Sequence, residues 1–138
     1  MRRFTRSRWL ASVTLAAAAG GLAGMSACDC RAKVMATSTV LGDVRVQIAS
    51  GGGLCGGAPT LGDFEVYRGP DATELVWQAS FAGSSNFPAV GELKYGTAPS
   101  GFTESQPALP LHVDDTIEFR VHGPGFRGGA RLAVTAGP

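Results

Sequence analysis

The chain of 138 residues lacks the residue patterns that mark hydrolases and nucleotide-binding proteins. No serine stands in a Gly-x-Ser-x-Gly elbow, and no Lys-Ser or Lys-Thr pair follows the glycine-rich stretch at residues 51–57. Only two histidines and three cysteines are present, which leaves few ligands for a metal centre. We therefore predict a protein that is not an enzyme and that carries no cofactor.

Positive charge is also scarce once the N-terminus is set aside. The first eight residues contain four arginines and no acidic residue, and an uncharged run follows from Trp9 to Ala27. Without residues 1–27, the remaining eight basic residues are outnumbered by 11 acidic residues, which gives a net charge of −3. No run of basic residues remains to bind nucleic acid or anionic lipid. We therefore expect no nucleic-acid partner.

The N-terminal 27 residues have the layout of a bacterial secretion signal. A basic head, an uncharged apolar stretch and small residues at its end follow one another in that order. An uncleaved membrane helix is the alternative, because a span needs about 20 apolar residues and this run is close to that length. The run is rich in alanine and glycine, however, so its transfer into a bilayer is weaker than that of a leucine-rich span. We predict that residues 1–27 are a cleaved signal peptide.

The four residues Met25–Cys28 resemble the lipobox of bacterial lipoproteins. That motif places a large apolar residue and two small residues before an obligatory cysteine; Ser26, Ala27 and Cys28 match it, whereas Met25 replaces the usual leucine. The resemblance implies a lipoprotein in which diacylglycerol modifies the Cys28 thiol and Cys28 becomes the first mature residue. Its acyl chains would anchor the protein to a membrane. Cleavage by an ordinary signal peptidase is the alternative, but it would place Met25 where a small residue is preferred.

Lipidation of Cys28 would leave Cys30 and Cys55 in an oxidising compartment. We predict a disulfide between these two cysteines, which would close a loop of roughly 26 residues and stabilise the domain by about 3 kcal/mol. A metal site that uses Cys28 and Cys30 is the alternative, but this pair supplies only two of the ligands that a closed site needs.

The mature chain alternates between apolar and polar residues in several short stretches, a pattern typical of strands with one buried face. The stretches are DVRVQIAS (43–50), DFEVYR (63–68), ELVWQASF (74–81), GELKYG (91–96), TIEFRVHG (116–123) and ARLAVTA (130–136), with a shorter strand over Leu109–Val113. Stretches rich in glycine and proline separate them, and no segment has a sustained helical period. Trp77 is the expected centre of the core.

This pattern predicts an all-β fold, with the domain at residues 43–138. We expect a six- to seven-stranded antiparallel β-sandwich of the immunoglobulin or fibronectin type, because such domains hold about this many short strands in about 100 residues. Residues 28–42 are then the lipidated cysteine and a tether. A small closed barrel is the alternative.

Residues 92–123 are also similar to a pattern in small bacterial lipoproteins of unassigned function. The matching positions are a Tyr-Gly pair that ends a strand, a Pro-x-Gly-Phe loop and two later prolines: Tyr95, Gly96, Pro99, Gly101, Phe102, Pro107 and Pro110. The resemblance implies the β-sandwich and the membrane anchor, and it brings no catalytic residues.

Two arrangements of histidine are candidates for chemistry. His112 and Asp114 would project to the same side of a strand and could form a dyad, but a turn at Asp114–Asp115 explains the same residues. His112 and His122 could lie on adjacent antiparallel strands and bind copper or zinc, although two ligands alone make a weak site.

Three further residues are candidates for an interaction surface. Phe126 and Arg127 stand at the expected tip of a loop at residues 123–129, and Phe102 stands in another expected loop. Aromatic and arginine side chains are common anchors in protein interfaces. A loop aromatic can equally fold back onto the core, which is the alternative for both phenylalanines.

Taken together, these patterns predict a lipid-anchored lipoprotein of the bacterial cell envelope that faces the periplasm or the cell exterior. Its partners would be the membrane, through the acyl chains on Cys28, and an envelope protein. We expect a non-enzymatic binding or structural module. The alternative is a periplasmic protein that binds a small ligand or a metal such as copper or zinc.

Overall fold

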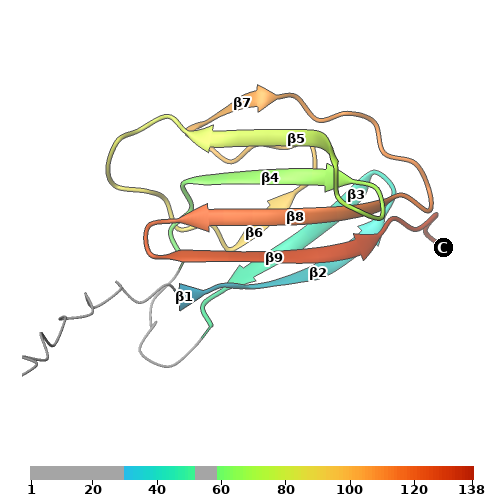
Figure 1. Ribbon diagram of the computed structural model, residues 1–138, viewed down its shortest axis with the longest axis horizontal. Helices are drawn as coiled ribbons and strands as arrows, with labels where there is room; N and C mark the ends of the chain where they lie inside the picture. The colour runs from blue at the N-terminus through green and yellow to red at the C-terminus, as the bar shows by residue number, and fades with distance from the viewer. Residues whose placement is uncertain (1–29, 52–58) are drawn as a thin grey trace, which may run out of the picture.

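The computed structural model describes residues 30–51 and 59–138, and the described part of the chain contains strands and no helix (Figure 1). In chain order the strands are β1 (Cys30–Arg31), β2 (Lys33–Val40), β3 (Asp43–Ala49), β4 (Asp63–Arg68), β5 (Glu74–Phe81), β6 (Glu92–Lys94), β7 (Phe102–Gln106), β8 (Thr116–Gly123) and β9 (Phe126–Ala133). The predicted all-β class is confirmed.

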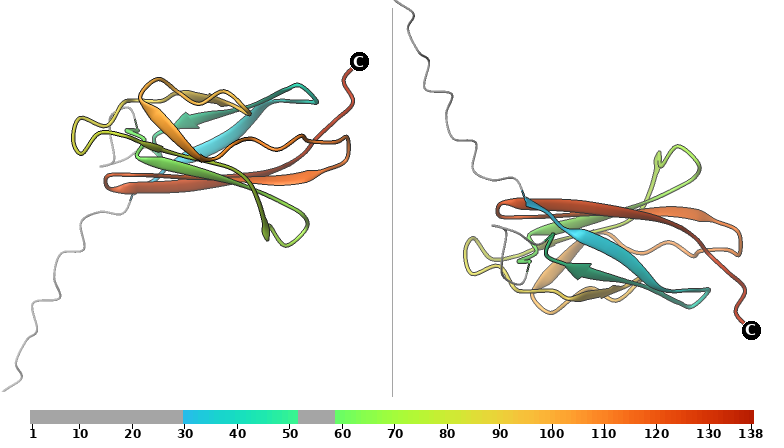
Figure 2. Two further views of the ribbon diagram at one scale, coloured as in Figure 1. Left: turned by 90° about the horizontal axis from the view of Figure 1, so that it is seen from above. Right: turned by 90° about the horizontal axis from the view of Figure 1, so that it is seen from below.

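The strands form two sheets that lie one over the other (Figure 2). The larger sheet has six strands in the order β1-β9-β8-β4-β5-β7, and the smaller has three in the order β2-β3-β6. The short β1 pairs with β9 in parallel, whereas the other pairs of these strands are antiparallel. This two-layer, mixed arrangement is consistent with a β-sandwich.

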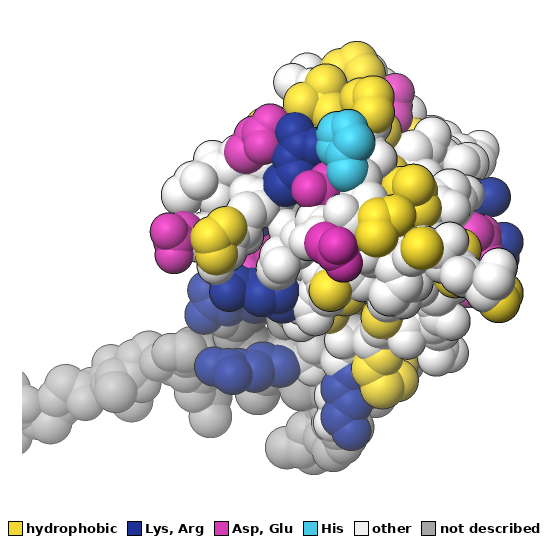
Figure 3. Space-filling model, turned by 90° about the vertical axis from the view of Figure 1, so that its right-hand side faces the viewer, with side chains coloured by type: hydrophobic (Ala, Val, Ile, Leu, Met, Phe, Trp, Pro, Cys, Tyr) yellow, Lys and Arg dark blue, Asp and Glu magenta, His cyan; other side chains and the backbone are white. Residues whose placement is uncertain are grey.

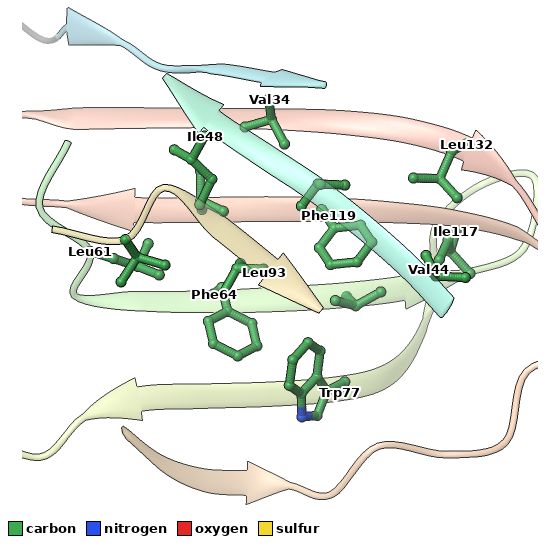
Figure 4. Packing of buried hydrophobic residues seen from close by; sticks show 14 of the residues in the cluster. Val34, Val44, Ile48, Leu61, Phe64, Trp77, Leu93, Ile117, Phe119 and Leu132 are labelled. Atoms are coloured by element: carbon green, nitrogen blue, oxygen red, sulfur yellow. The ribbon is translucent and has the colours of Figure 1, made fainter. Parts of the chain in front are cut away.

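The core lies between the two sheets, where the apolar residues of each alternating stretch meet (Figure 4). Trp77 is fully buried at its centre, as predicted, with its ring centroid 4.5 Å from that of Phe64 and 5.3 Å from that of Tyr95. Its indole Nε1 donates a hydrogen bond of 2.7 Å to Glu104 Oε1 on β7, so the polar atom of the ring has a partner.

The expected alternation holds in β3, β4 and β8 but is shifted in β5. Both Val76 and Trp77 are fully buried, whereas Leu75, predicted to face inward, is only half-buried. The register shifts between Val66 and Tyr67, which pair with Trp77 and Leu75 and leave Val76 as an extra residue. A β-bulge of this kind turns consecutive side chains toward the same face.

The N-terminal residues predicted to form a tether are part of the fold, which is a correction. Residues 30 and 31 pair with β9, and Lys33–Val40 pairs with β3 from end to end apart from a register shift between Ala36 and Ser38. Only Val34 of β2 is buried, because β2 is an edge strand that alternates weakly. Its valines and threonines favour an extended backbone even without a clear apolar period.

The order of strands between β6 and β8 also differs from the prediction. Residues 109–113 form no strand, whereas Phe102–Gln106, predicted as a loop, forms β7 and pairs with β5. Pro107 and Pro110 lack the backbone N–H that a ladder requires. The segment is held instead by the Tyr95 hydroxyl, which donates a hydrogen bond of 2.6 Å to the carbonyl of Leu109.

Candidate functional site

Basic side chains gather on the outer face of the six-stranded sheet, at the end where β1 begins. The register places Arg31 of β1 beside Arg127 of β9, and Arg127 beside His122 of β8. Arg120 lies two residues before His122 on the same strand and therefore projects from the same face. Residues from three strands thus converge, although they are far apart in the sequence.

A shallow groove of about 420 Å³ lies between these side chains. We call it the basic groove, and its lining includes Arg31, Arg120, His122, Arg127, Gly128 and Gly129. Among the residues that the structure describes, the lining contains three arginines and a histidine but no carboxylate, so the groove has the chemistry of a site for anions.

Two glycines of β9 are required by the close approach of neighbouring strands. A Cβ on Gly128 would stand 2.4 Å from the carbonyl oxygen of Ala32, and one on Gly129 would stand 2.8 Å from that of Phe119. Either distance is shorter than van der Waals contact allows. Because Gly129 pairs with Arg120 and has no side chain, it also leaves the space beside Arg120 open.

Arg120 is held in place at the inner wall of the basic groove. Its Nε donates a hydrogen bond of 2.6 Å to Glu118 Oε1, and its guanidinium lies 4.4 Å from the centroid of the Tyr67 ring. Glu118 also accepts a hydrogen bond of 2.7 Å from Arg131 Nη2. These hydrogen bonds to Arg120 and Arg131 lower the pKa of Glu118. One carboxylate therefore serves two guanidinium groups.

The other basic residues of the groove are more exposed. His122 Nδ1 lies 3.1 Å from Asp63 Oδ2, and its side chain is 43% exposed. Arg31 and Arg127 are exposed residues of an edge strand and its neighbour. Among the described residues, Arg31 takes part in no salt bridge.

The two histidines do not come together, contrary to the arrangement proposed for a metal site. His112 precedes β8 in a segment that forms no strand, whereas His122 lies near the far end of β8. Thr116, where β8 begins, and His122 are six residues apart in an extended strand, so about 20 Å separate their Cα atoms. Within residues 30–51 and 59–138, no group of three or more histidine, cysteine or acidic side chains could hold a metal ion.

The candidate His112–Asp114 dyad, which was the alternative to a turn, does not form. His112 lies beside Asp115 instead, with its Nδ1 3.6 Å from Asp115 Oδ2 and its backbone N–H donating a bond of 2.8 Å to the same oxygen. Asp114 adopts a positive φ of 71°, which ends any strand there. This favours the turn interpretation of these residues.

Of the three predicted interaction residues, only Arg127 is exposed. Phe126 is the first residue of β9 and is 8% exposed, so it belongs to the core. Phe102 is half-buried in β7, with its ring centroid 5.9 Å from those of Phe64 and Phe81. The expected loop at residues 123–129 is instead a tight turn. Gly123 already pairs with Phe126, so only Pro124 and Gly125 connect β8 to β9.

A second groove, of about 440 Å³, lies at the opposite end of the domain and is mainly apolar. Its lining includes Leu41, Val44, Tyr95, Leu109 and Leu111. Figure 3 looks onto this end, where hydrophobic side chains lie among charged ones. Of the described residues in this lining, Tyr95 alone has a side-chain hydroxyl, and burial raises its pKa to about 12. None of the described lining residues offers an anion a basic side chain.

The cysteine predictions fall partly outside the described residues. Cys28 and Cys55 lie outside the described ranges, whereas Cys30 opens β1. The β3–β4 connection leaves β3 close to Cys30, because a Cβ on Gly51 would stand 2.2 Å from the carbonyl oxygen of Arg31. The connection reaches the six-stranded sheet again at Thr60. The carbonyl oxygen of Thr60 lies against Gly123 of β8, because a Cβ on Gly123 would stand 1.8 Å from it.

Comparison with known proteins finds no family model that matches the chain, and no curated protein or solved structure matches it either. In the part of the chain that the structure describes, no helix has the length and hydropathy to cross a membrane.

Sequence reasoning missed Arg31 and Arg120 as members of a site. Neither stands in a basic run, and each alternates with apolar or small residues as the polar position of a strand. The signal that could have found them is the hairpin of TIEFRVHG and FRGGARLA, whose register brings Arg120 and Arg127 to one face. The pairing of Arg31 with Arg127 depends on a parallel contact that no local pattern predicts.

Proposed function

We propose that this protein is a lipid-anchored module of the bacterial cell envelope that acts by binding an anionic partner rather than by catalysis. In this proposal residues 1–27 are a signal peptide, and acyl chains on Cys28 hold the mature protein at a membrane. The observation that carries it is the position of β1, which begins at Cys30, two residues after the lipobox cysteine.

The short distance along the chain would keep the whole domain close to its anchor. A single residue, Asp29, separates Cys28 from β1, and three residues of fully extended chain span at most about 11 Å. A domain attached so closely would meet envelope partners at a raised local concentration without the freedom that a long tether gives.

We also propose the disulfide between Cys30 and Cys55. Gly51 lies against Arg31, the neighbour of Cys30, and Thr60 lies against Gly123, which pairs with Phe126 beside Cys30. Both ends of the connection that contains Cys55 therefore lie near β1. A bond here would fasten the first strand, and with it the anchored end, to the body of the domain.

Binding is favoured over catalysis by the chemistry of the basic groove. Guanidinium groups are permanently charged donors that recognise carboxylate and phosphate oxygens, but they do not provide a nucleophile. The fold proposed for the domain is the immunoglobulin or fibronectin type of sandwich. It is supported by the two packed sheets and by a tryptophan buried between them.

Fractionation of cells that express the full chain tests the anchor. We expect the wild-type protein to stay with the membranes after washes at high salt and to incorporate radiolabelled fatty acid. The variant Cys28→Ala should lose both properties, whereas the matched variant Cys30→Ala should keep both because its lipobox is intact. Release of the wild-type protein by salt, without a label, would refute the lipoprotein proposal.

A further inference from the structure

We propose that the basic groove binds the anionic headgroups of the membrane to which Cys28 is anchored, and that it thereby holds the outer face of the six-stranded sheet toward the bilayer. This inference rests on the proposed lipidation of Cys28. It adds a second contact with the membrane and a defined orientation of the domain.

A short stretch of chain joins Cys28 to the groove. Arg31 lines the groove and is three residues from Cys28, so its Cα cannot be more than about 11 Å from that of the lipidated residue. Neighbouring strands are about 5 Å apart, so Arg127 and His122 follow within about 10 Å of Arg31 across β9 and β8. An anchor at Cys28 therefore brings the groove to the depth of the headgroups.

The charge of the lining fits this ligand. Arg31, Arg120 and Arg127 carry permanent positive charge, and each arginine near an anionic lipid surface adds attraction of about fivefold in binding. Three acidic residues flank the groove. Glu118 and Asp63 are engaged by basic side chains, and Glu65, which stands opposite Arg120 on β4, accepts hydrogen bonds from Tyr67 and Gln78. Guanidinium groups also pair with phosphate through two parallel hydrogen bonds, which suits a phospholipid headgroup.

The rest of the same sheet face explains why this end would meet the membrane. On this face Glu118 lies two residues before Arg120 and pairs with Tyr67, while Glu65 pairs with Arg120 on one side and with Gln78 on the other. The chain without residues 1–27 has a net charge of −3, so an anionic bilayer repels the mature protein as a whole. The basic groove gathers three of its eight basic residues in one place, and such a bilayer attracts that place.

Modification of individual arginines by phenylglyoxal tests the proposal on the mature, membrane-extracted protein. The protein is reconstituted in vesicles of phosphatidylcholine, with or without phosphatidylglycerol, and the reaction of each arginine is followed by peptide mass spectrometry. We expect Arg31, Arg120 and Arg127 to react about fivefold more slowly in the anionic vesicles, and high salt to abolish the difference. Arg45 and Arg68, which lie away from the groove, should react at the same rate in both.

A pair of double variants separates charge recognition from crowding by the anchor. In Arg31→Gln/Arg127→Gln, Arg120 should lose its protection by anionic lipid. The control variant Arg45→Gln/Lys94→Gln removes the same charge from the three-stranded sheet. In this variant Arg120 should still be protected by anionic lipid. Equal rates for Arg31 in the two kinds of vesicle, or slow rates in both, would overturn the proposal.

Two further readouts identify the source of any failure. Flotation with phosphatidylcholine vesicles measures the anchor alone. If the protein does not float, the proposed lipidation and this inference both fail. If it floats but Arg31 and Arg127 are not protected, only the proposed binding of headgroups by the groove fails. Inorganic phosphate is added to the phosphatidylcholine vesicles as a last arm. If it protects both arginines as well as phosphatidylglycerol does, the groove is a site for a free anion, and the membrane orientation is refuted.

Discussion

The two ends of the six-stranded sheet both carry arginines but differ in how these arginines are placed. At the end away from β1, Arg68 donates hydrogen bonds to Glu74 Oε1 and Oε2 at 2.6 and 2.8 Å and lies 3.5 Å from Asp115 Oδ2. At the end where β1 begins, Arg31, Arg127 and Arg120 line a groove whose described residues include no carboxylate.

This difference arises from register rather than from composition. On a sheet, a side chain interacts mainly with the residues directly opposite on neighbouring strands. Arg131 faces Glu118 across β9 and β8, whereas Arg127 faces His122 on one side and Arg31 on the other. The same alternating pattern therefore sets an arginine opposite a carboxylate at Arg131 and brings basic side chains together at Arg127.

The largest expected effect concerns the end that contains β1. If Cys30 and Cys55 are bonded, Cys55→Ser should lower the free energy of unfolding by about 3 kcal/mol, because the unfolded chain regains the entropy of the closed loop. Urea unfolding of the oxidised protein measures this loss. Cys30→Ser should lose a similar amount, and adding a reductant should destabilise neither variant further. A Cys55→Ser variant as stable as the wild type would contradict the bond.

The next largest effect tests whether the groove depends on close strand contact. Gly128→Ala places a Cβ against the backbone of Ala32 and should destabilise the domain by about 2 kcal/mol, a typical effect of overpacking. The matched variant is Gly91→Ala, where a Cβ meets nothing within 4 Å; its effect should stay within about 0.5 kcal/mol. Equal denaturation midpoints for the two variants would show that the strands can move apart freely.

At the opposite end, Tyr95 should make stability fall in alkaline solution. Its pKa is raised to about 12 by burial, so the folded state keeps the phenol protonated while the unfolded state ionises near pH 10. Stability is therefore full below pH 10 and is lost as the pH rises toward 12. Tyr95→Phe should lower the free energy of unfolding by about 1 kcal/mol at pH 7, because the hydrogen bond to Leu109 is lost. Its stability should not show the decrease between pH 10 and pH 12 that the Tyr95 hydroxyl causes. Unfolding curves at pH 8 and pH 11 measure both effects, and parallel losses in the two proteins would contradict this role.

The smallest effect concerns Glu118, which lies between the two ends. Hydrogen bonds to Arg120 and Arg131 lower its pKa below 4.5, so its stabilisation is present above that pH and is lost as the pH falls through the folded value. Glu118→Gln should lower stability by about 0.5–1 kcal/mol at pH 7, and this difference should shrink as the pH falls and the carboxylate is protonated in the folded state. A difference that stays constant down to low pH would mean that packing, and not charge, is responsible.

The sequence predicted the part of the fold that depends on local alternation. Phe64, Phe119 and Trp77 face the core as their period of two requires, and the all-β class follows from it. Strands without that pattern were missed: β2 has one buried residue, and β7 exposes most of its length because both are edge strands. The bulge beside Val76 could not be predicted either, because it is set by the pairing of β4 with β5.

The candidate site was predicted only in fragments. Arg127 was singled out as exposed, and this is confirmed, but its supposed partner Phe126 is buried because the loop at residues 123–129 is mostly strand. The absence of a basic run made anionic lipid an unexpected ligand. Charge that is dispersed in the sequence becomes concentrated only when the fold sets Arg31, Arg120 and Arg127 side by side.

The most direct test of the central claim is the intact mass of the protein extracted from membranes. We expect a chain that begins at Cys28, carries the added mass of diacylglycerol with or without a further acyl chain, and is lighter by two hydrogens for the bond between Cys30 and Cys55. A chain that retains residues 1–27, or one that is cleaved and has no acyl mass, would contradict the anchor and the membrane-facing groove that depends on it.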